Sequence, residues 1–208
     1  MNRAGIVLLL LLLSACAVAP APKDAFYRLD VAQPAQHFDR PPLPGVLEVD
    51  RLEADGAVAE RALAFETRPG GPVERYRYDF WSEQPGILLQ DRIAAYLRAA
   101  NAAGRVVTPE LRVPPDWTLR GKIRRFEQVA GAGKVAVELQ LAVVSARDGS
   151  LVLMDTYRVE APSGSDVESM VGAIGAATSD VLARVVAALG PAPRVVPQRG
   201  GTAGGPRG

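Results

Sequence analysis

The feature that most constrains the fold of this chain is a run of strictly alternating apolar residues in its second half. The alternating apolar positions are Val135, Val137, Leu139, Leu141 and Val143. A period of two is that of a β-strand with one buried face. Arg147-Asp148-Gly149 then forms a turn signal, and the segment 151–159 returns with apolar side chains. The sequence therefore predicts two long antiparallel strands joined by a tight turn.

Two other segments have apolar residues at the spacing of amphipathic α-helices. The first begins at Pro85 and is stopped by the segment 101–104, and the second ends at Gly190. Ser165 and Glu168 have the spacing of a capping box, so Ser165 is predicted to cap the second helix. The predicted buried positions of the two helices are Leu89, Ile93, Tyr96, Leu97, Ala100, Val167, Val171, Ile174, Val181, Leu182, Val185 and Leu189.

Shorter segments with the composition of strands precede and separate the helices. They are 26–29, 46–52, 63–67, 73–78 and 117–126, and the third and fourth flank a Pro-Gly-Gly turn, which predicts a hairpin. Strands and helix stripes each have one face to bury, and a sheet covered by two helices buries them all. The sequence thus predicts an α+β fold, a two-layer sandwich in which an antiparallel-rich sheet carries both helices on one face.

The chain opens with the three parts of a secretory signal. A short positively charged start is followed by the apolar run Ile6–Leu13, which is shorter than the roughly 20 residues that a membrane span needs. The tetrapeptide Leu13-Ser14-Ala15-Cys16 resembles the lipobox of bacterial lipoproteins, in which the cysteine is acylated and the preceding peptide is removed. Two alternatives remain: an ordinary signal peptide with an incidental cysteine, and an uncleaved anchor. Ala17, where an aspartate favours inner-membrane retention in enteric-type sorting, indicates the outer membrane.

These features divide the chain into four parts. Residues 1–15 are predicted to be the lipoprotein signal peptide, and residues 16–23 an extended Ala/Pro-rich tether that carries the lipid on Cys16. Residues 24–190 contain no internal repeat and no long linker, so we expect one domain there. Residues 191–208 are rich in Gly, Pro and Arg, which predicts a disordered tail.

Composition argues against most enzymatic and nucleic-acid functions. With 24 Lys and Arg against 23 Asp and Glu, the chain has a formal net charge of +1 and no basic surplus for nucleic acid. The single Cys16 and the single His37 do not suffice for a zinc site or a Cys-His pair within the domain. Gly131-Ala132-Gly133-Lys134 lacks the spacing of a phosphate-binding loop, and Ser165 is far in sequence from the histidine that a nucleophile would need. We therefore expect no catalytic residues, no cofactor and no metal.

One strand-like segment is locally basic, with Arg120, Lys122, Arg124 and Arg125 close together. These side chains could contact lipid phosphates or an acidic partner. They could equally form the solvent face of an edge strand, where charge discourages aggregation between sheets. The second interpretation is favoured.

The segment from Tyr76 to Pro85 contains four aromatic residues and leaves two interpretations open. Trp81 could fill the seam between the helix and the sheet, as a core residue. Alternatively, the segment could form a partner interface, because aromatic side chains concentrate binding energy at interfaces. The candidate interface residues are Tyr78, Trp81 and Pro85.

Taken with the lipobox, two motifs carry a resemblance to a known family. Phe26-Tyr27-Arg28-Leu29 soon follows the lipobox, and a Tyr-x-Tyr-x-x-Trp-x-x-x-Pro run opens the first helix. The chain resembles the ABC-type transport auxiliary lipoproteins from about Phe26 to Leu189. That family includes the paraquat-inducible lipoprotein of Gram-negative bacteria. The resemblance implies a non-enzymatic protein that works with an inner-membrane ABC transporter and a mammalian-cell-entry-domain protein in moving lipids across the periplasm.

The expected function is therefore that of an outer-membrane lipoprotein, bound through acylated Cys16 and facing the periplasm, that docks the distal end of such a transport system. An autonomous lipid carrier and an outer-membrane assembly factor are the alternatives, and the chain could also assemble with copies of itself. Small residues pad the predicted helix faces, which favours close packing over a lipid cavity. These residues are Ala94, Ala95, Ala173, Ala176 and Ala177.

Overall fold

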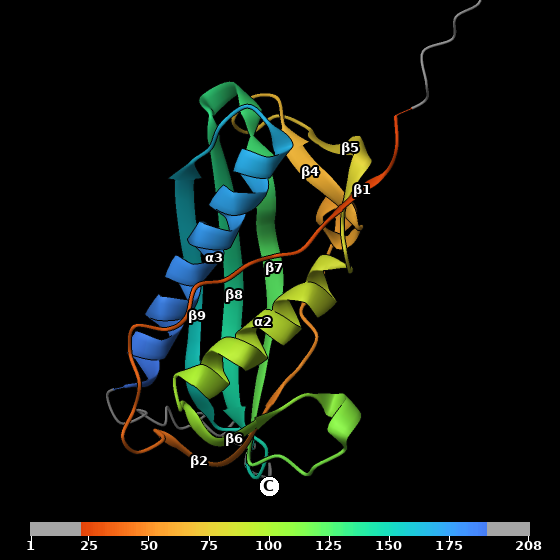
Figure 1. Ribbon diagram of the computed structural model, residues 1–208. Coiled ribbons are helices and arrows are strands. Elements are labelled where there is room, and N and C mark those ends of the chain that lie inside the picture. The colour runs from red at the N-terminus through yellow and green to blue at the C-terminus, as the bar shows by residue number, and fades with distance from the viewer. Residues whose placement is uncertain (1–21, 191–208) are drawn as a thin grey trace, which may run out of the picture.

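The fold is built on one nine-stranded sheet with two long helices on one of its faces (Figure 1). The structure is a computed structural model, and residues 22–190 are described. The strands are β1 (Ala25–Tyr27), β2 (Leu43–Val49), β3 (Glu53–Ala54), β4 (Ala62–Glu66), β5 (Val73–Trp81), β6 (Ala103–Val107), β7 (Trp117–Val129), β8 (Lys134–Ser145) and β9 (Leu151–Pro162). The helices are α2 (Pro85–Ala99) and α3 (Val167–Leu189), and the 3₁₀ turns are η1 (Gly56–Ala59), η2 (Pro109–Leu111) and η3 (Ala130–Ala132).

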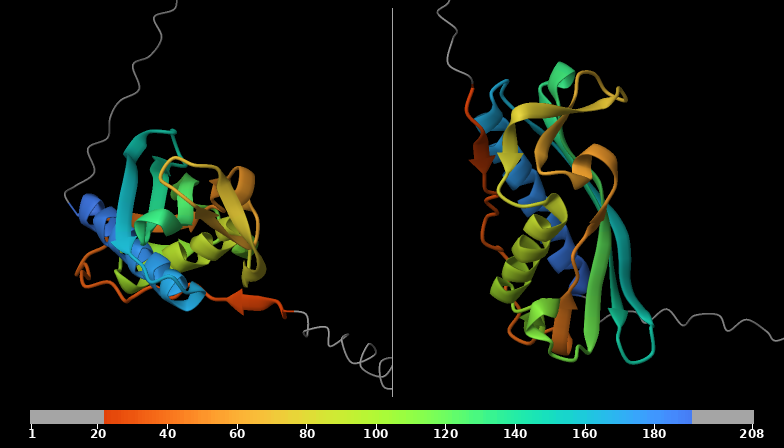
Figure 2. Two further views of the ribbon diagram at one scale, coloured as in Figure 1. Left: turned by 90° about the horizontal axis from the view of Figure 1, so that it is seen from above. Right: turned by 90° about the vertical axis from the view of Figure 1, so that its right-hand side faces the viewer.

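Strand β7 organises the sheet. It pairs with β8 in antiparallel register along its whole length, and β8 pairs with β9 in the same way. The opposite edge of β7 receives β2, β3 and β4 one after another, all parallel to it. Strand β5 pairs antiparallel with β4, while β1 and β6 pair parallel with β5 and β2. The result is a curled, mixed sheet (Figure 2).

This topology corrects one part of the sequence prediction. The α+β class and the two helices are found, but the sheet is not antiparallel-rich, because five of its eight strand pairs are parallel. All three antiparallel pairs are between consecutive strands, which short turns connect. The parallel partners of β7 come from segments far away in the sequence, and a half-buried strand alternates in the same way whichever direction its partner runs.

Local sequence signals place most elements to within a few residues. The predicted strand 46–52 differs, because β2 ends at Val49 and β3 begins at Glu53, and one predicted helix cap is an exception. Gly149 turns β8 into β9 with a φ of 71°, and Pro85 stands in the first turn of α2. The exception is the cap of α3, which is Asp166 and not Ser165. An Asp166 carboxylate oxygen accepts a hydrogen bond from the Ser169 backbone N–H at 2.8 Å. Because the helix begins one residue later than predicted, Ser169 and not Glu168 occupies the third helical position.

The core lies between the sheet and the two helices. Every second residue of β8 from Val135 to Val143 is fully buried, as the alternation predicts. α3 packs on β8 and β9 through residues such as Ile174 and Val181. By length and composition alone α3 could cross a membrane, but half of its most apolar window is buried within the fold. α3 is therefore a core helix of this fold.

The segment between β1 and β2 crosses the outer side of both helices like a strap (Figure 1). Its Leu29 is fully buried, the Ala32 N–H donates to Ser179 Oγ at 2.9 Å, and the Phe38 N–H donates to the Ala100 carbonyl at 3.0 Å. Gly175 of α3 has no Cβ where one would lie 2.3 Å from the Asp30 carbonyl oxygen, so glycine permits this close approach. The strap fixes β1 at one end of the molecule, opposite the end where α3 stops.

Candidate functional site

The aromatic segment of β5 divides between the two faces of the sheet. Trp81 is 1% exposed, and its ring lies 5.1 Å from that of Phe126 on β7. Pro85 is buried as well, in the first turn of α2. The structure therefore favours the core interpretation of Trp81 and corrects the prediction that Trp81 and Pro85 form a partner interface: neither side chain offers a surface to a partner in this fold.

Tyr78, the third predicted interface residue, lies at the surface and is half-buried, with the Arg77 guanidinium 5.4 Å from its ring. Its role in binding a partner stays a prediction. Its neighbour Tyr76 is tied into the fold, because its hydroxyl donates to Gln128 Oε1 at 2.7 Å and its ring lies 4.9 Å from Phe65. Both tyrosines are half-buried, and the Tyr76 hydroxyl already has a partner within the fold.

A second aromatic pair lies on the outside of the fold. Phe26 of β1 is 58% exposed, and its ring stacks on that of Phe80 of β5 at 5.6 Å. The Arg61 guanidinium lies 5.2 Å from the Phe26 ring, within the range of a cation–π contact. These residues and Ala62 line a recess of about 400 Å³ at the edge of the sheet. We call Phe26, Arg61, Ala62 and Phe80 the Phe26 patch.

Arg61 is held in place within this patch. Its Nε donates to the Trp81 carbonyl at 3.3 Å, and its Nη2 donates to the Ser82 carbonyl at 2.8 Å. Neither Arg61 nor Phe80 was predicted from the sequence as a site residue. Strand alternation contains the missing signal: Phe80 and Trp81 are consecutive in a strand, so when one faces the core the other must face outward.

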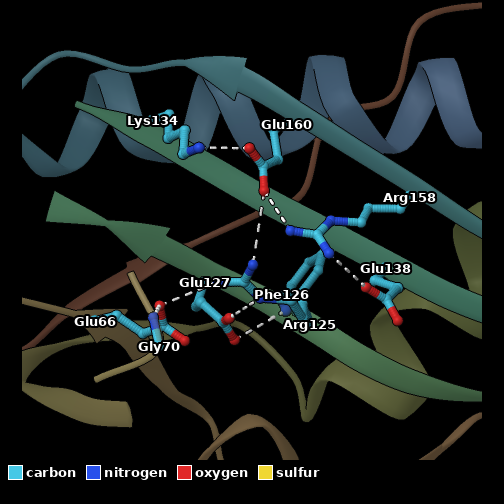
Figure 3. A network of polar contacts seen from close by, with 9 residues as sticks. All are labelled: Glu66, Gly70, Arg125, Phe126, Glu127, Lys134, Glu138, Arg158 and Glu160. Atoms are coloured by element: carbon cyan, nitrogen blue, oxygen red, sulfur yellow. Dashed lines mark hydrogen bonds and ion pairs between the residues drawn. The ribbon is translucent and has the colours of Figure 1, made fainter. Parts of the chain in front are cut away.

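A cluster of charged side chains, which we call the ion cluster, lies on the face of the sheet away from α3 (Figure 3). Arg125 of β7 is its centre, with Glu127 at 2.6 Å, Glu66 at 3.2 Å and Glu160 at 3.7 Å. Lys134 also binds Glu160, at 2.5 Å. Three neighbouring strands and β4 are thereby joined across the outer face.

The pKa values of two glutamates in this cluster are shifted in opposite directions. Burial raises the pKa of Glu127, against the lowering effect of its hydrogen bond to Arg125. Hydrogen bonds from Lys134 and Arg158 lower the pKa of Glu160 to about 2. Each carboxylate has a basic partner within the cluster, which makes the cluster a structural tie between strands and not a site with a free charge.

The basic stretch of β7 does not form the edge surface that the sequence predicted. β7 lies inside the sheet, so the prediction of an edge strand is wrong. Lys122 pairs with Asp55, and Arg125 belongs to the ion cluster. Arg124 is the extra residue of a β-bulge and donates to Gln140 Oε1 at 2.7 Å. Three of the four basic side chains thus have partners within the domain.

The larger recesses open to solvent. One of about 380 Å³ is lined by charged residues, among them Asp50, Arg120 and Lys122, and another of about 350 Å³ lies beside Trp117. Ala94 and Ala177 are buried where the helices pack. Within residues 22–190, no group of three or more His, Cys, Asp or Glu side chains is arranged to hold a metal ion. The predicted signal peptide, Cys16 and the tail 191–208 lie outside the described residues.

Comparison with known families gives one match that spans most of the chain. The family model described as "ABC-type transport auxiliary lipoprotein component" matches residues 27–187. The match includes both helices up to the last turn of α3, and it begins within β1. A search of curated proteins finds no match.

Two solved structures with this fold are distant in sequence, and a third gives a weaker match. A Xanthomonas campestris protein of the DUF330 family is 19% identical, with a TM-score of 0.68 over 78% of this chain and 92% of its own. An uncharacterized protein is 14% identical, with a TM-score of 0.64 over 80% of this chain and 98% of its own. PelC from Paraburkholderia phytofirmans, a dodecamer, is 16% identical, with a TM-score of 0.46 over 76% of this chain and 94% of its own.

Proposed function

Because the chain belongs to the family of ABC-type transport auxiliary lipoprotein components, we propose that it is an outer-membrane lipoprotein that docks the distal end of an ABC-type lipid-transport system. The family is one of transport auxiliaries and not of enzymes. The proposed partners are an inner-membrane ABC transporter, which would hydrolyse ATP, and a mammalian-cell-entry-domain protein in the periplasm. The match over residues 27–187 is the observation that carries this proposal.

The proposed membrane attachment is through acylated Cys16. The lipobox Leu13-Ser14-Ala15-Cys16 supports it, as does the absence of any other cysteine that could be modified. Two or more acyl chains hold a protein stably on a bilayer, whereas one chain gives only reversible attachment. The near balance of 24 basic and 23 acidic residues would add little attraction to anionic lipids, so the lipid has to supply the attachment.

Mass spectrometry of the protein extracted from membranes tests the attachment. We expect a chain that lacks residues 1–15 and carries added acyl mass on Cys16. Cys16→Ser should release a folded chain from the membrane, because position 16 precedes the first strand. A chain that begins at Met1, or an unmodified Cys16 in the membrane fraction, would contradict the proposal.

The packing of the described domain supports docking over lipid carriage. A lipid carrier needs a roomy apolar channel to bury an acyl chain, comparable with the roughly 300–1,000 Å³ of a ligand pocket. Two recesses of the described residues are of that size, but both open to solvent, and charged side chains such as Arg120 line one of them. Between the helices and the sheet, buried residues such as Leu89, Ile93 and Val185 fill the space.

Lipid content separates the two functions. The full chain with Cys16→Ser, purified without detergent, should carry no stoichiometric phospholipid when it is examined by native mass spectrometry and by organic extraction. The acylated chain in detergent is the control for extraction efficiency. One phospholipid for each Cys16→Ser chain would favour the autonomous carrier over the docking component.

A further inference from the structure

We propose that the Phe26 patch is a membrane-contact surface. Phe26, stacked on Phe80 and flanked by Arg61, would lie in the headgroup region of the same bilayer that holds the lipid anchor. The inference deepens the proposed function and rests on it in one respect, since it requires acylation at Cys16. It assigns to this end of the domain a direct contact with phospholipids.

The chemistry of the patch fits a bilayer interface. Aromatic side chains are enriched at the level of the lipid headgroups, and arginine can place an apolar stem in the interface while its guanidinium binds phosphate. Phe26 is 58% exposed on a strand of three residues at the edge of the sheet. Arg61 spends two of its five donors on backbone carbonyls, which hold it beside the ring and leave others for a phosphate oxygen.

The length of the tether places this patch next to the membrane. Phe26 follows Cys16 by ten residues. A fully extended chain of that length spans at most about 35 Å, and a flexible one reaches about half of that distance on average. α3 alone, with 23 residues, is about 35 Å long. The end of the domain that holds β1 therefore stays close to the bilayer, whereas the far end of α3 can point away from it (Figure 1).

The charges around the patch predict contact with phospholipids in general. Glu60, which lines the recess, is paired with Arg75, so its charge is compensated within the domain. Asp24 also lines the recess, and its negative charge offsets the positive charge of Arg61 in the formal sum. The patch thus has no net basic character with which to select anionic headgroups. We expect its contact to depend on Phe26 and on the phosphate that all common phospholipids share, and to persist at high salt.

A contact at this end would orient the whole domain. The loop that contains η2 lies at the opposite end of the molecule from β1 (Figure 1), and its Leu111 is 61% exposed. With the Phe26 patch on the bilayer, Leu111 would point into the periplasm, where a partner that spans the periplasm would meet it. Leu111 is therefore the matched control position: exposed, apolar and distant from the membrane.

Brominated lipids provide the test. The full chain carrying Phe26→Trp, and separately Leu111→Trp, would be acylated in a Gram-negative host and reconstituted into phosphatidylethanolamine–phosphatidylglycerol vesicles with brominated acyl chains. The unsubstituted chain supplies the background emission of Trp81 and Trp117. We expect the tryptophan at position 26 to lose most of its emission to bromine quenching, and to be blue-shifted, at low and high salt alike. The tryptophan at position 111 should keep its emission.

Every other result overturns the inference, and the results differ in what they leave standing. A chain that floats with the vesicles but shows equal quenching at the two positions, or none, refutes the contact and leaves the anchor intact. A blue shift at position 26 without bromine quenching would mean that protein, or the acyl chain of Cys16 itself, covers the recess. A chain that does not float with the vesicles refutes the anchor, and the inference with it.

Discussion

Two aromatic pairs that share the strand β5 differ in almost everything except their geometry. Trp81 and Phe126 lie 5.1 Å apart on the inner face of the sheet, and Phe26 and Phe80 lie 5.6 Å apart on the outer face. The inner pair is buried, with Trp81 1% exposed, while Phe26 is 58% exposed. Because Phe80 and Trp81 are consecutive, strand alternation alone decides which one stabilises the fold and which one remains available for contact.

β7 repeats the same division with charges. Phe126 faces the core, and its neighbours Arg125 and Glu127 belong to the ion cluster on the outer face. The bulge at Arg124 adds one residue to β7, which shifts the alternation so that Ile123 and Phe126 both face inward. The inner face is thus held by packing, and the outer face by ion pairs and an exposed aromatic contact.

The largest effect is expected on the inner face. Trp81→Ala should lower the free energy of unfolding by about 3–5 kcal/mol, because it removes a large, fully buried ring and leaves a cavity beside Phe126. Urea unfolding of the full chain with Cys16→Ser would measure the loss. A loss below about 1 kcal/mol would contradict the core role of Trp81 and make it an interface candidate again.

An intermediate, pH-dependent effect is expected in the ion cluster. Burial raises the pKa of Glu127 in the folded chain above its ordinary value of 4.5. Between these two pKa values the folded chain holds a proton on Glu127 that the unfolded chain has lost. Burial of the ionised Glu127 carboxylate lowers the stability of the folded state. Compared with Glu127→Gln, the wild type should therefore lose relative stability as the pH rises from 4.5 through the raised pKa of Glu127. Urea unfolding between pH 2 and pH 8 would measure the difference.

Glu160→Gln is the matched control with the opposite sign. The pKa of Glu160 is lowered to about 2 by Lys134 and Arg158, so its stabilising effect is complete above 4.5 and is lost as the pH falls toward 2. The effect should reach about 1 kcal/mol or less, since solvent screens these ion pairs. If both variants changed with pH in the same direction, the opposite electrostatics of Glu127 and Glu160 would be refuted.

The smallest effect on stability is expected on the exposed aromatic pair. Phe26→Ala should cost about 1 kcal/mol or less, because more than half of the ring is already in water and a surface aromatic pair contributes little beyond its area. The same urea measurement compares it with Trp81→Ala. A loss as large as that of Trp81→Ala would show that the outer pair is part of the core, and the contrast between the faces would fail.

Local patterns explain which parts of this fold could be predicted from the sequence. The alternation from Val135 to Val143 and the turn at Gly149 place the β8–β9 pair, and helical spacing after Pro85 places α2. These signals lie within one element or its nearest neighbours. The pairing of β7 with β2, β3 and β4 depends on residues that are far apart in the chain. The apolar pattern of one strand does not predict which strand it pairs with or in which direction.

The candidate site was predictable only in part, for a related reason. The lipobox is a local motif and predicts Cys16 as the lipidated residue, which lies outside the described residues. The sequence shows that aromatic side chains are concentrated in β5. The face of the sheet on which each of them lies depends on β1 and β7. Phe26 and Phe126 supply the stacking partners of Phe80 and Trp81, and both come from distant segments. The face that each aromatic occupies is therefore a tertiary property.

Capture of the transport system is the most direct test of the central claim that this chain is a membrane-anchored docking component. The acylated full chain would be cross-linked in intact cells of its own bacterium, purified through an affinity tag and analysed by mass spectrometry, with Cys16→Ser as the matched control. We expect the ATPase, the permease and a mammalian-cell-entry-domain protein to be enriched with the acylated chain over the control. Recovery of the acylated chain from the outer membrane without any of these subunits would contradict the account.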